Sequence, residues 1–284
     1  MSKIPFVLTF NEVYALGGSV AIMSLLDNKD AGTEYEIFIL YDYFEDETMA
    51  KLQSLSPIHF IKIPNDLFEG FTHTPRFPLI GGYNMLIPDL FMDYDRVLFS
   101  DADVLVRKDL SHLMDLNLDD YYWAGTSLSK KDRIFCQNYP VLAQYCQENY
   151  YSNGFMVVNE RKLREDNIGL EQFRTVAKKY GKLLYFVDQD IWNIVCNKVY
   201  RLPPGYLFPD FIYSEIKSDV IWHCAPYDMD IDKNFEDIFV VHCSTANLDK
   251  IWTLPDDKIY PEYLHYMKKS PLYKPYENRK EVLQ

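Results

Sequence analysis

The spacing of apolar residues predicts strands that alternate with helices in the first part of the chain. Residues 4–10 are almost continuously apolar, as expected of a strand covered on both faces. Apolar residues at helical spacing follow over 13–26, a second strand is predicted at 35–41, a short helix begins at Asp46, and a third strand covers 58–63. This alternation is typical of a parallel α/β sheet, which binds ligands beyond the carboxyl ends of its strands.

The second half of the chain is less regular. From apolar spacing and stop signals we predict strands at 122–127, 155–158 and 238–242, a mostly helical segment at 160–180 that ends at Gly181, a helix from Asp188 and a last helix at 260–269. The proline-containing residues 203–236 are expected to form a loop. Because no linker is evident, we expect one domain over 1–252, followed by a C-terminal helical extension over 253–284.

Composition narrows the function classes. The 284 residues are 48% hydrophobic, enough for a full core, and 29 basic against 42 acidic residues give a net charge of −13. Such a charge argues against nucleic-acid binding. The five cysteines lack CxxC spacing, and residues 1–10 do not resemble a secretion signal. These features predict buried, reduced thiols and a cytoplasmic protein, with peripheral contact at the inner face of the cell membrane left open.

The segment 96–107, RVLFSDADVLVR, carries the strongest chemical signal. An apolar strand runs into Asp101 and Asp103, and a second apolar strand, Val104 to Val106, follows at once. In extended backbone these two carboxylates project from one face, and buried charges need compensation. A divalent cation with a phosphate ligand is the natural partner. The DxD pattern alone is weak, because a solvated turn or a helix cap explains most such pairs; the flanking strands favour a site.

Three other polar groups lie at the ends of predicted strands or helices. His242 ends an apolar strand and precedes Lys250 and Trp252 in HCSTANLDKIW; a lone histidine is usually structural, but this one could complete a manganese site. The segment 188–190, DQD, suits helix capping as well as contacts with sugar hydroxyls. The segment 152–154, SNG, suits a simple turn as well as it suits a functional site.

These groups occur in the order found in the retaining glycosyltransferases of family 8, which include bacterial lipooligosaccharide galactosyltransferases and glycogenin-like enzymes. The resemblance runs from Ile4 to about Tyr276. Its strongest matches are YDRVLFSDADVLVRKDLSHL, the Asn-Gly stretch before FMVVN, VDQDIWN, and the histidine followed by lysine and tryptophan. The resemblance implies a GT-A fold, a Rossmann-like and mostly parallel sheet with helices on both faces. It also implies a UDP-hexose donor and Mn2+, with Mg2+ as an alternative.

Site roles follow from the same resemblance. The metal ligands would be Asp101, Asp103 and His242. The donor nucleotide would contact Thr9, Asn11, Tyr14, Asp101, Ala102 and Lys250, with Tyr14 stacking on the base and Lys250 on the diphosphate. Asp188, Gln189 and Asn153 would form the catalytic group that faces the donor sugar, with Ser152 near it. The chain departs from the family pattern at Met85, where arginine is frequent, at Leu128, where an acid is frequent, and at Ile251, where proline is usual.

The expected reaction moves glucose or galactose from UDP to a hydroxyl of a glycan, glycolipid or glycoprotein, with retention. Retention could follow from same-face attack, which we favour, or from a covalent intermediate on Asp188 or Asp190. One alternative function is a haloacid-dehalogenase-type phosphatase that uses Asp101 and Asp103. Another is a non-catalytic carbohydrate-binding protein with a structural metal. A nucleotidyltransferase is disfavoured, because the first strand lacks a glycine-rich phosphate loop after it.

Overall fold

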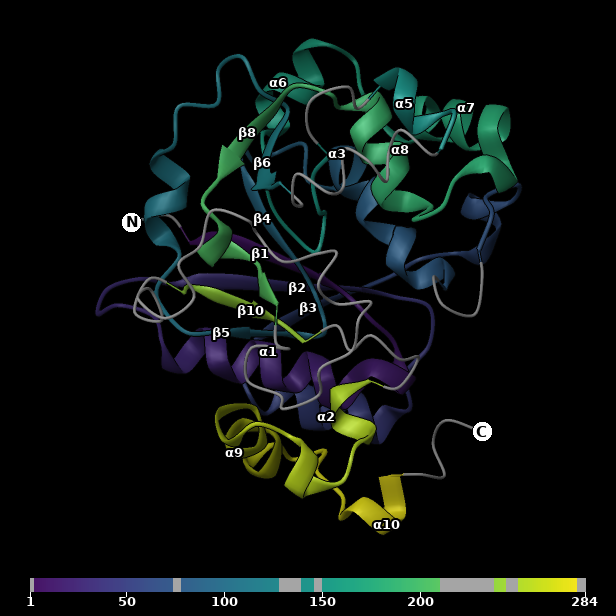
Figure 1. The fold of residues 1–284 in the computed structure, drawn as a ribbon. Helices are drawn as coiled ribbons and strands as arrows, with labels where there is room; N and C mark the ends of the chain where they lie inside the picture. The colour runs from purple at the N-terminus through teal and green to yellow at the C-terminus, as the bar shows by residue number, and fades with distance from the viewer. Residues whose placement is uncertain are drawn as a thin grey trace.

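The computed structural model describes residues 3–73, 78–127, 139–145, 150–209, 238–243 and 250–279. Its main sheet has the strand order β3-β2-β1-β4-β7-β6-β8 (Figure 1). Strand β7 pairs antiparallel with both of its neighbours, and the other pairs of this sheet are parallel. The strands are β1 (Ile4–Thr9), β2 (Tyr35–Tyr41), β3 (Ile58–Lys62), β4 (Val97–Asp101), β6 (Trp123–Thr126), β7 (Phe155–Val158) and β8 (Val199–Leu202).

Helices cover both faces of this sheet because alternate strand residues point to opposite sides. On one face Phe6 and Leu8 of β1 belong to an apolar core that includes α1 (Ala15–Asp27) and α2 (Asp46–Gln53). On the other face Val7 belongs to a core that includes α7 (Leu170–Tyr180) and α8 (Asp188–Val195). Because both sides are buried, β1 is apolar almost throughout, which is the pattern that predicted it.

A second, small sheet begins just after β4, a central strand of the first sheet. Strand β5 (Val104–Val106) pairs antiparallel with β10 (Val240–His242), which pairs in parallel with β9 (Phe208–Pro209). In this register His242 lies opposite Val104. Strand β5 follows β4 after only two residues, so this pairing fixes the end of β10 beside the carboxyl end of β4.

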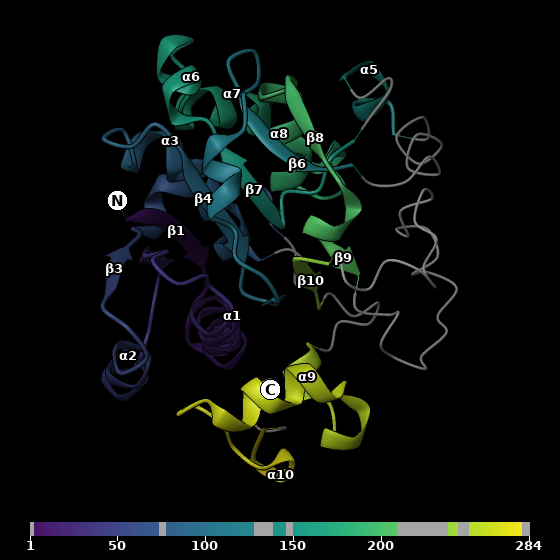
Figure 2. The same ribbon diagram turned by 90° about the vertical axis from the view of Figure 1, so that its left-hand side faces the viewer.

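The C-terminal helix α9 (Pro261–Lys269) packs against α1, as Figure 2 shows. Val20 of α1 shares a core with Tyr263 and Met267 of α9, and the hydroxyls of Ser19 and Ser270 lie 2.6 Å apart. The expected boundary at 252/253 stays a prediction.

The remaining elements are α3 (Ile87–Leu90), α5 (Leu142–Tyr145), α6 (Glu160–Glu165), α10 (Tyr276–Arg279) and the 3-10 turns η1 (Glu12–Tyr14), η2 (Asn65–Phe68), η3 (Leu79–Leu86), η4 (Ser111–Asp115), η5 (Gly181–Leu183), η6 (Pro204–Tyr206), η10 (Ile251–Thr253) and η11 (Asp256–Lys258).

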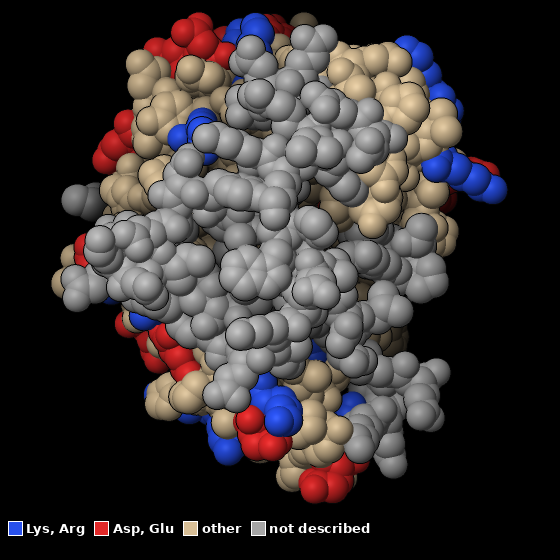
Figure 3. All heavy atoms as spheres, in the orientation of Figure 1, with Lys and Arg blue, Asp and Glu red and all other residues tan. Residues whose placement is uncertain are grey.

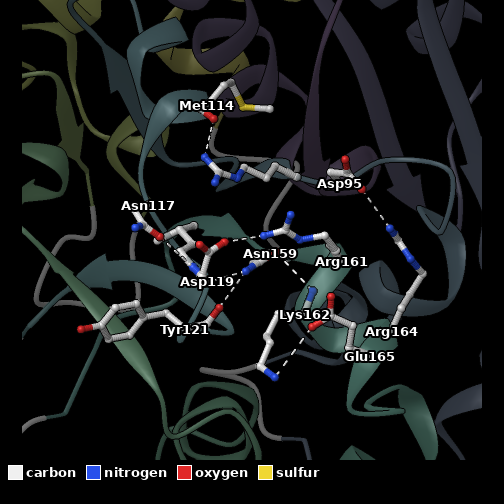
Figure 4. A network of polar contacts seen from close by, with 12 residues as sticks. Asp95, Met114, Asn117, Asp119, Tyr121, Asn159, Arg161, Lys162, Arg164 and Glu165 are labelled. Carbon is white, nitrogen blue, oxygen red and sulfur yellow. Dashed lines mark hydrogen bonds and ion pairs between the residues drawn. The ribbon is translucent and has the colours of Figure 1, made fainter.

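Polar contacts close the sheet at the end away from the carboxyl end of β4 (Figure 4). Asn159, which directly follows β7, donates from its amide to the backbone carbonyls of Leu118 and Tyr121 and caps α6 by accepting from the backbone N–H of Lys162. Ion pairs from Arg161 and Arg164 of α6 to Asp119 and Asp95 lie beside this cap. This end of the sheet is therefore occupied by structural contacts.

Most elements predicted from apolar spacing are confirmed to within two residues. The segment 160–180 is mostly helical and ends at Gly181, as predicted; the structure divides it into α6 and α7, with Asn167 at a positive φ of 54° between them. The predicted loop at 203–236 is corrected at its start, where η6 and β9 form; residues 210–236 lie outside the described residues. Strand β8 was not predicted, because its residues are mostly half-buried or exposed and show no apolar run.

Surface charge, helix length and cysteine burial can be compared with the sequence predictions for the described residues. On the face in Figure 3, the described Lys and Arg side chains are scattered among Asp and Glu instead of forming one basic surface. Among the described helices, none has the length and apolarity needed to cross a bilayer. Cys196 and Cys243 are fully buried, as expected, whereas Cys136, Cys146 and Cys224 lie outside the described residues.

Candidate active site

Asp101, Asp103 and His242 form a cluster where the two sheets meet. Each offers one ligand atom, and the three atoms lie within 4.8 Å of one another. Asp101 ends β4, and its backbone N–H donates to the carbonyl of Gly154 at 2.9 Å. The carbonyl of Asp103 accepts from the backbone N–H of Cys243 at 2.7 Å. Backbone pairing of β4, β5 and β10 thus positions all three side chains.

Positive groups surround the Asp103 carboxylate. The Lys250 ammonium donates to its Oδ2 at 2.7 Å, and His242 Nε2 lies 3.4 Å from its Oδ1. Burial raises the pKa of Asp103, but Lys250 and His242 outweigh burial and bring the net pKa well below its usual range. In turn, Asp103 raises the pKa of both His242 and Lys250 against the effect of their burial. Asp103 is therefore ionised, with the Lys250 ammonium and the His242 imidazole beside its carboxylate.

Asp101 lacks this compensation. Burial and the neighbouring Asp103 raise the pKa of Asp101 to about 7, and His242 Nε2 lies 3.9 Å from its Oδ2. A cation between the carboxylates would remove this cost, and two carboxylates with an imidazole suit Mn2+ or a similar divalent ion. The absence of a side chain at Gly154 leaves space for these ligands, because a Cβ there would lie 3.2 Å from both Asp101 Oδ2 and His242 Cε1. The residues present therefore fit a divalent metal site.

Polar atoms without partners lie beside this cluster. Thr9 is the register partner of Asp101 across β1 and β4. Thr9 Oγ1 and Asn11 Oδ1 are buried and have no hydrogen-bond partner among the described residues, while Asn11 Nδ2 donates to Asp42 at 3.4 Å. Lys250 Nζ lies 5.5 Å from the centroid of the Tyr14 ring, which connects this segment to the acidic cluster. Buried polar atoms of this kind are satisfied when a polar ligand binds.

Asp188 anchors a second polar group at the start of α8. Its Oδ2 accepts from Asn153 Nδ2 at 2.6 Å and from Asn84 Nδ2 at 3.1 Å. Burial raises the pKa of Asp188 to about 6, against the lowering effect of the two amides. Val187, directly before the helix, has a positive φ of 45° that is rare for a β-branched residue.

The other predicted residues divide between these groups. Ala102 is buried between the two aspartates, and Ser152 Oγ accepts from the backbone N–H of Gly154 at 3.3 Å. The side-chain amide of Gln189 donates to the hydroxyl of Tyr150 at 2.9 Å. Asp190 is fully buried and accepts from the Tyr150 hydroxyl and from the backbone N–H groups of Tyr185 and Phe186, so three donors hold its carboxylate.

Asn84 was not among the predicted site residues, and the contact of Gly154 with the acidic cluster was not foreseen. The only signal for Asn84 in the sequence is an amide within the apolar run LIGGYNMLI. Met85, which stands where the family often has arginine, is buried at 1% exposure and supplies no charge. Leu128 lies outside the described residues.

Comparison with known proteins identifies the family. A model of "Glycosyl transferase family 8" matches residues 5–242. The chain belongs to glycosyl transferase family 8. It is therefore a glycosyltransferase, and the resemblance noted from its motifs is confirmed.

Curated bacterial proteins are similar to this chain. General stress protein A of Bacillus subtilis is 24% identical over 264 residues, which cover 89% of this chain and 88% of that protein. The lipopolysaccharide 1,2-glucosyltransferase of Escherichia coli is 26% identical over 65% of this chain. This chain spans 56% of the glucosyltransferase's length.

Solved structures confirm the expected GT-A fold. The galactosyltransferase LgtC, solved with donor and acceptor sugar analogs, is 21% identical, with a TM-score of 0.75 over 97% of this chain and 100% of that one. The bifunctional glycosyltransferase WbbM is 20% identical, with a TM-score of 0.72 over 99% of this chain and 52% of that one. The mixed sheet with helices on both faces is thus the GT-A arrangement.

Proposed function

We propose that this glycosyltransferase moves a hexose, glucose or galactose, from a UDP-sugar to a hydroxyl of a glycan or glycoconjugate, with retention of configuration. The observation that carries the proposal is the cluster of Asp101, Asp103 and His242 with Lys250 attached to it, beyond the carboxyl end of β4. A site for a diphosphate needs such a set of metal ligands and a cation beside it. Hexose transfer agrees with the glucosyltransferase and galactosyltransferase names of two relatives.

The metal ligands would be Asp101, Asp103 and His242. When bound, the ion, which we propose to be Mn2+, supplies Lewis-acid stabilisation of the charge that develops on the departing diphosphate. The imidazole in the set favours Mn2+ over Mg2+, which prefers oxygen ligands alone. Lys250 adds a fixed positive charge next to Asp103, where the same negative charge develops.

Thr9, Asn11 and Tyr14 would hold the nucleoside. The buried Asn11 Oδ1 accepts no hydrogen bond from a described residue, so it favours a base that presents an N–H donor. Uracil has such a group at ring position N3, whereas N3 of cytosine is an acceptor and only the exocyclic amine of cytosine could donate. The Tyr14 ring would contact the base, and the buried Ala102 between the two aspartates would allow close approach of the ligand to the backbone.

Asp188, Asn153 and Gln189 would orient the donor sugar. In the reaction the acceptor oxygen bonds to the anomeric carbon as the bond from that carbon to the phosphate oxygen breaks, and the acceptor proton passes to the phosphate oxygen on the same face. Three donors already hold the buried Asp190 carboxylate, which supports same-face attack over a covalent intermediate on Asp190. Asp188 is held by two amides on Oδ2, which supports an orienting role over a covalent one.

A donor screen tests this proposal. The protein is mixed with Mn2+ and each of several UDP-, GDP- and CDP-sugars, and nucleotide release is measured with and without EDTA. We expect release only from a UDP-hexose and a loss of at least about 100-fold in EDTA. Asp103→Asn should behave like EDTA treatment, whereas Asp119→Asn, at the opposite end of the sheet, should not.

Two results would reject the proposal. Release from no UDP-sugar, together with absent stabilisation by UDP and Mn2+ in thermal unfolding, would exclude UDP-hexose transfer. Rapid turnover of p-nitrophenyl phosphate would revive the phosphatase alternative, which family membership does not favour. The cytoplasmic location and the peripheral membrane contact stay predictions.

A further inference from the structure

Asn84 connects the protein core to the candidate sugar site. It lies in η3, is fully buried, and uses both ends of its amide. Its Nδ2 donates to Asp188 Oδ2 at 3.1 Å, and its Oδ1 accepts from the indole Nε1 of Trp192 at 2.9 Å. Trp192 is itself fully buried, one turn after Asp188 in α8. The three side chains form a continuous hydrogen-bonded chain from the core to the site.

Donor and acceptor chemistry fixes the direction of each hydrogen bond from Trp192 through Asn84 to Asp188. An indole N–H can only donate, so it requires the oxygen of the Asn84 amide. The amide NH2 must then face Asp188, which must accept. An Asn84 amide turned the other way would place its oxygen against a carboxylate and its NH2 against an N–H, at the cost of two buried hydrogen bonds. Trp192 therefore sets the orientation of the amide that Asp188 meets.

Two amides converge on one oxygen of Asp188. Asn153 Nδ2 also donates to Oδ2, at 2.6 Å, from the segment before β7. Asn84 comes from η3, before β4. Two segments far apart in the sequence therefore hold the Asp188 carboxylate. Asp188 Oδ1 is the oxygen that neither amide engages. A carboxylate held in this way presents one oxygen in a defined direction to a sugar hydroxyl.

We propose that Asn84 is a positioning residue which, fixed by Trp192, holds Asp188 in the orientation that receives the hexose of the donor. This inference rests on the proposed function, since it deepens the role given there to Asp188. It assigns discrimination of the sugar to the chain Trp192–Asn84–Asp188 and binding of UDP to the acidic cluster and Lys250. Loss of Asn84 should therefore affect the hexose and spare the nucleotide.

The test compares Asn84→Ala with Trp192→Phe, which retains a ring but removes the indole N–H. Steady-state kinetics with the UDP-hexose selected by the donor screen should give a kcat about 10- to 100-fold lower for Asn84→Ala. Affinity for UDP with Mn2+ should stay within about twofold, because those contacts are separate. Thermal stabilisation by UDP-hexose should fall to that given by UDP alone. Trp192→Phe should show a smaller loss of the same kind.

Trp123→Phe is the matched control for loss of core packing. Trp123 is also fully buried and donates its indole N–H at 2.9 Å, but to the carbonyl of Cys196 and not to a site residue. It should lower the unfolding temperature as Trp192→Phe does and leave kcat within about twofold. Equal losses of kcat in the two tryptophan variants would overturn the proposal, because they would trace the effect to packing.

A double-mutant cycle decides whether Asn84 acts through Asp188. On an Asp188→Ala background, Asn84→Ala should cause no further loss of the residual donor hydrolysis. An additive loss, or full kcat in Asn84→Ala, would reject the positioning role while wild-type activity upholds the proposed function. A wild-type protein that neither binds UDP nor cleaves any UDP-hexose would reject the proposed function, and this inference with it.

Discussion

The Lys250 ammonium lies 2.7 Å from the Asp103 carboxylate, although the two residues are 147 positions apart in the chain. Asp103 is held where β4 passes into β5, and Lys250 immediately precedes η10. The Trp252 ring of η10 packs against Gly17 of α1 and lies edge-on to Tyr14. The Lys250 side chain is thus fixed by its ion pair with Asp103, and its backbone by the packing of Trp252 two residues later.

Lys250→Met should reduce transfer mainly through kcat. The ammonium stands where charge develops on the departing diphosphate, so its removal should lower kcat by about 100-fold with a smaller change in KM for the donor. Steady-state kinetics measures both constants. Lys268→Met is the control, because Lys268 pairs with Asp256 and is half exposed, and it should leave both constants unchanged. An unchanged kcat in Lys250→Met would contradict the role given to this residue.

Gly154→Ala should weaken metal binding. The added Cβ would lie 3.2 Å from Asp101 Oδ2 and from His242 Cε1, so one of these ligands must shift. We expect the dissociation constant for Mn2+, measured by calorimetry, to rise about 10-fold. Gly81→Ala is the matched control, since a Cβ there meets no atom within 4 Å. Equal Mn2+ affinity in the two variants would show that the cluster tolerates the contact.

Gly17→Ala should destabilise the fold, against the usual effect of alanine in a helix. A Cβ at this position would lie 2.3 Å from the Trp252 ring. Overpacking of this kind should lower the free energy of unfolding by about 1–3 kcal/mol, whereas relief of glycine entropy alone would raise it by about 0.5–1 kcal/mol. Denaturant unfolding measures the difference. The loss should shrink on a Trp252→Phe background, where the overlapping ring is absent; a stabilised single variant would disprove the overlap.

Glu160→Gln should change the pH dependence of stability. Both carboxylate oxygens of Glu160 are buried without a hydrogen-bond partner among the described residues, and burial raises its pKa to about 8 from 4.5. Between these values the folded state retains a proton that the unfolded chain releases. The contribution of the protonated group is complete below pH 4.5 and is lost as the pH rises through about 8.

The glutamine variant should therefore gain stability relative to wild type as the pH rises from 5 to 8, by up to about 1.4 kcal/mol per pH unit. Denaturant unfolding at several pH values measures this difference. Glu165→Gln, in the same helix but 57% exposed, is the control for loss of an exposed carboxylate. A difference for Glu160→Gln that stays constant with pH would mean that Glu160 ionises normally in the folded protein.

How much the sequence predicted depended on the range of the interactions involved. The apolar run of β1 and the spacing in α1 are set by local burial, so the alternation of strands and helices could be predicted. Strand β8 could not, because its half-exposed residues gain their place from pairing with β6. The predicted helical segment at 160–180 divides into two helices near Asn167, whose left-handed conformation apolar spacing does not encode.

The sequence by itself determined the chemistry available here: two carboxylates after a buried strand, a histidine, a lysine and an aspartate at a helix start, in the order that indicated family 8. Only the tertiary structure decided which of these meet. Pairing of β5 with β10 brings His242 to Asp103. Tertiary packing makes Tyr150 the acceptor for the Gln189 amide and Asp188 the acceptor for the Asn84 amide. Residue type fixes what a side chain can donate or accept, whereas long-range packing fixes its partner.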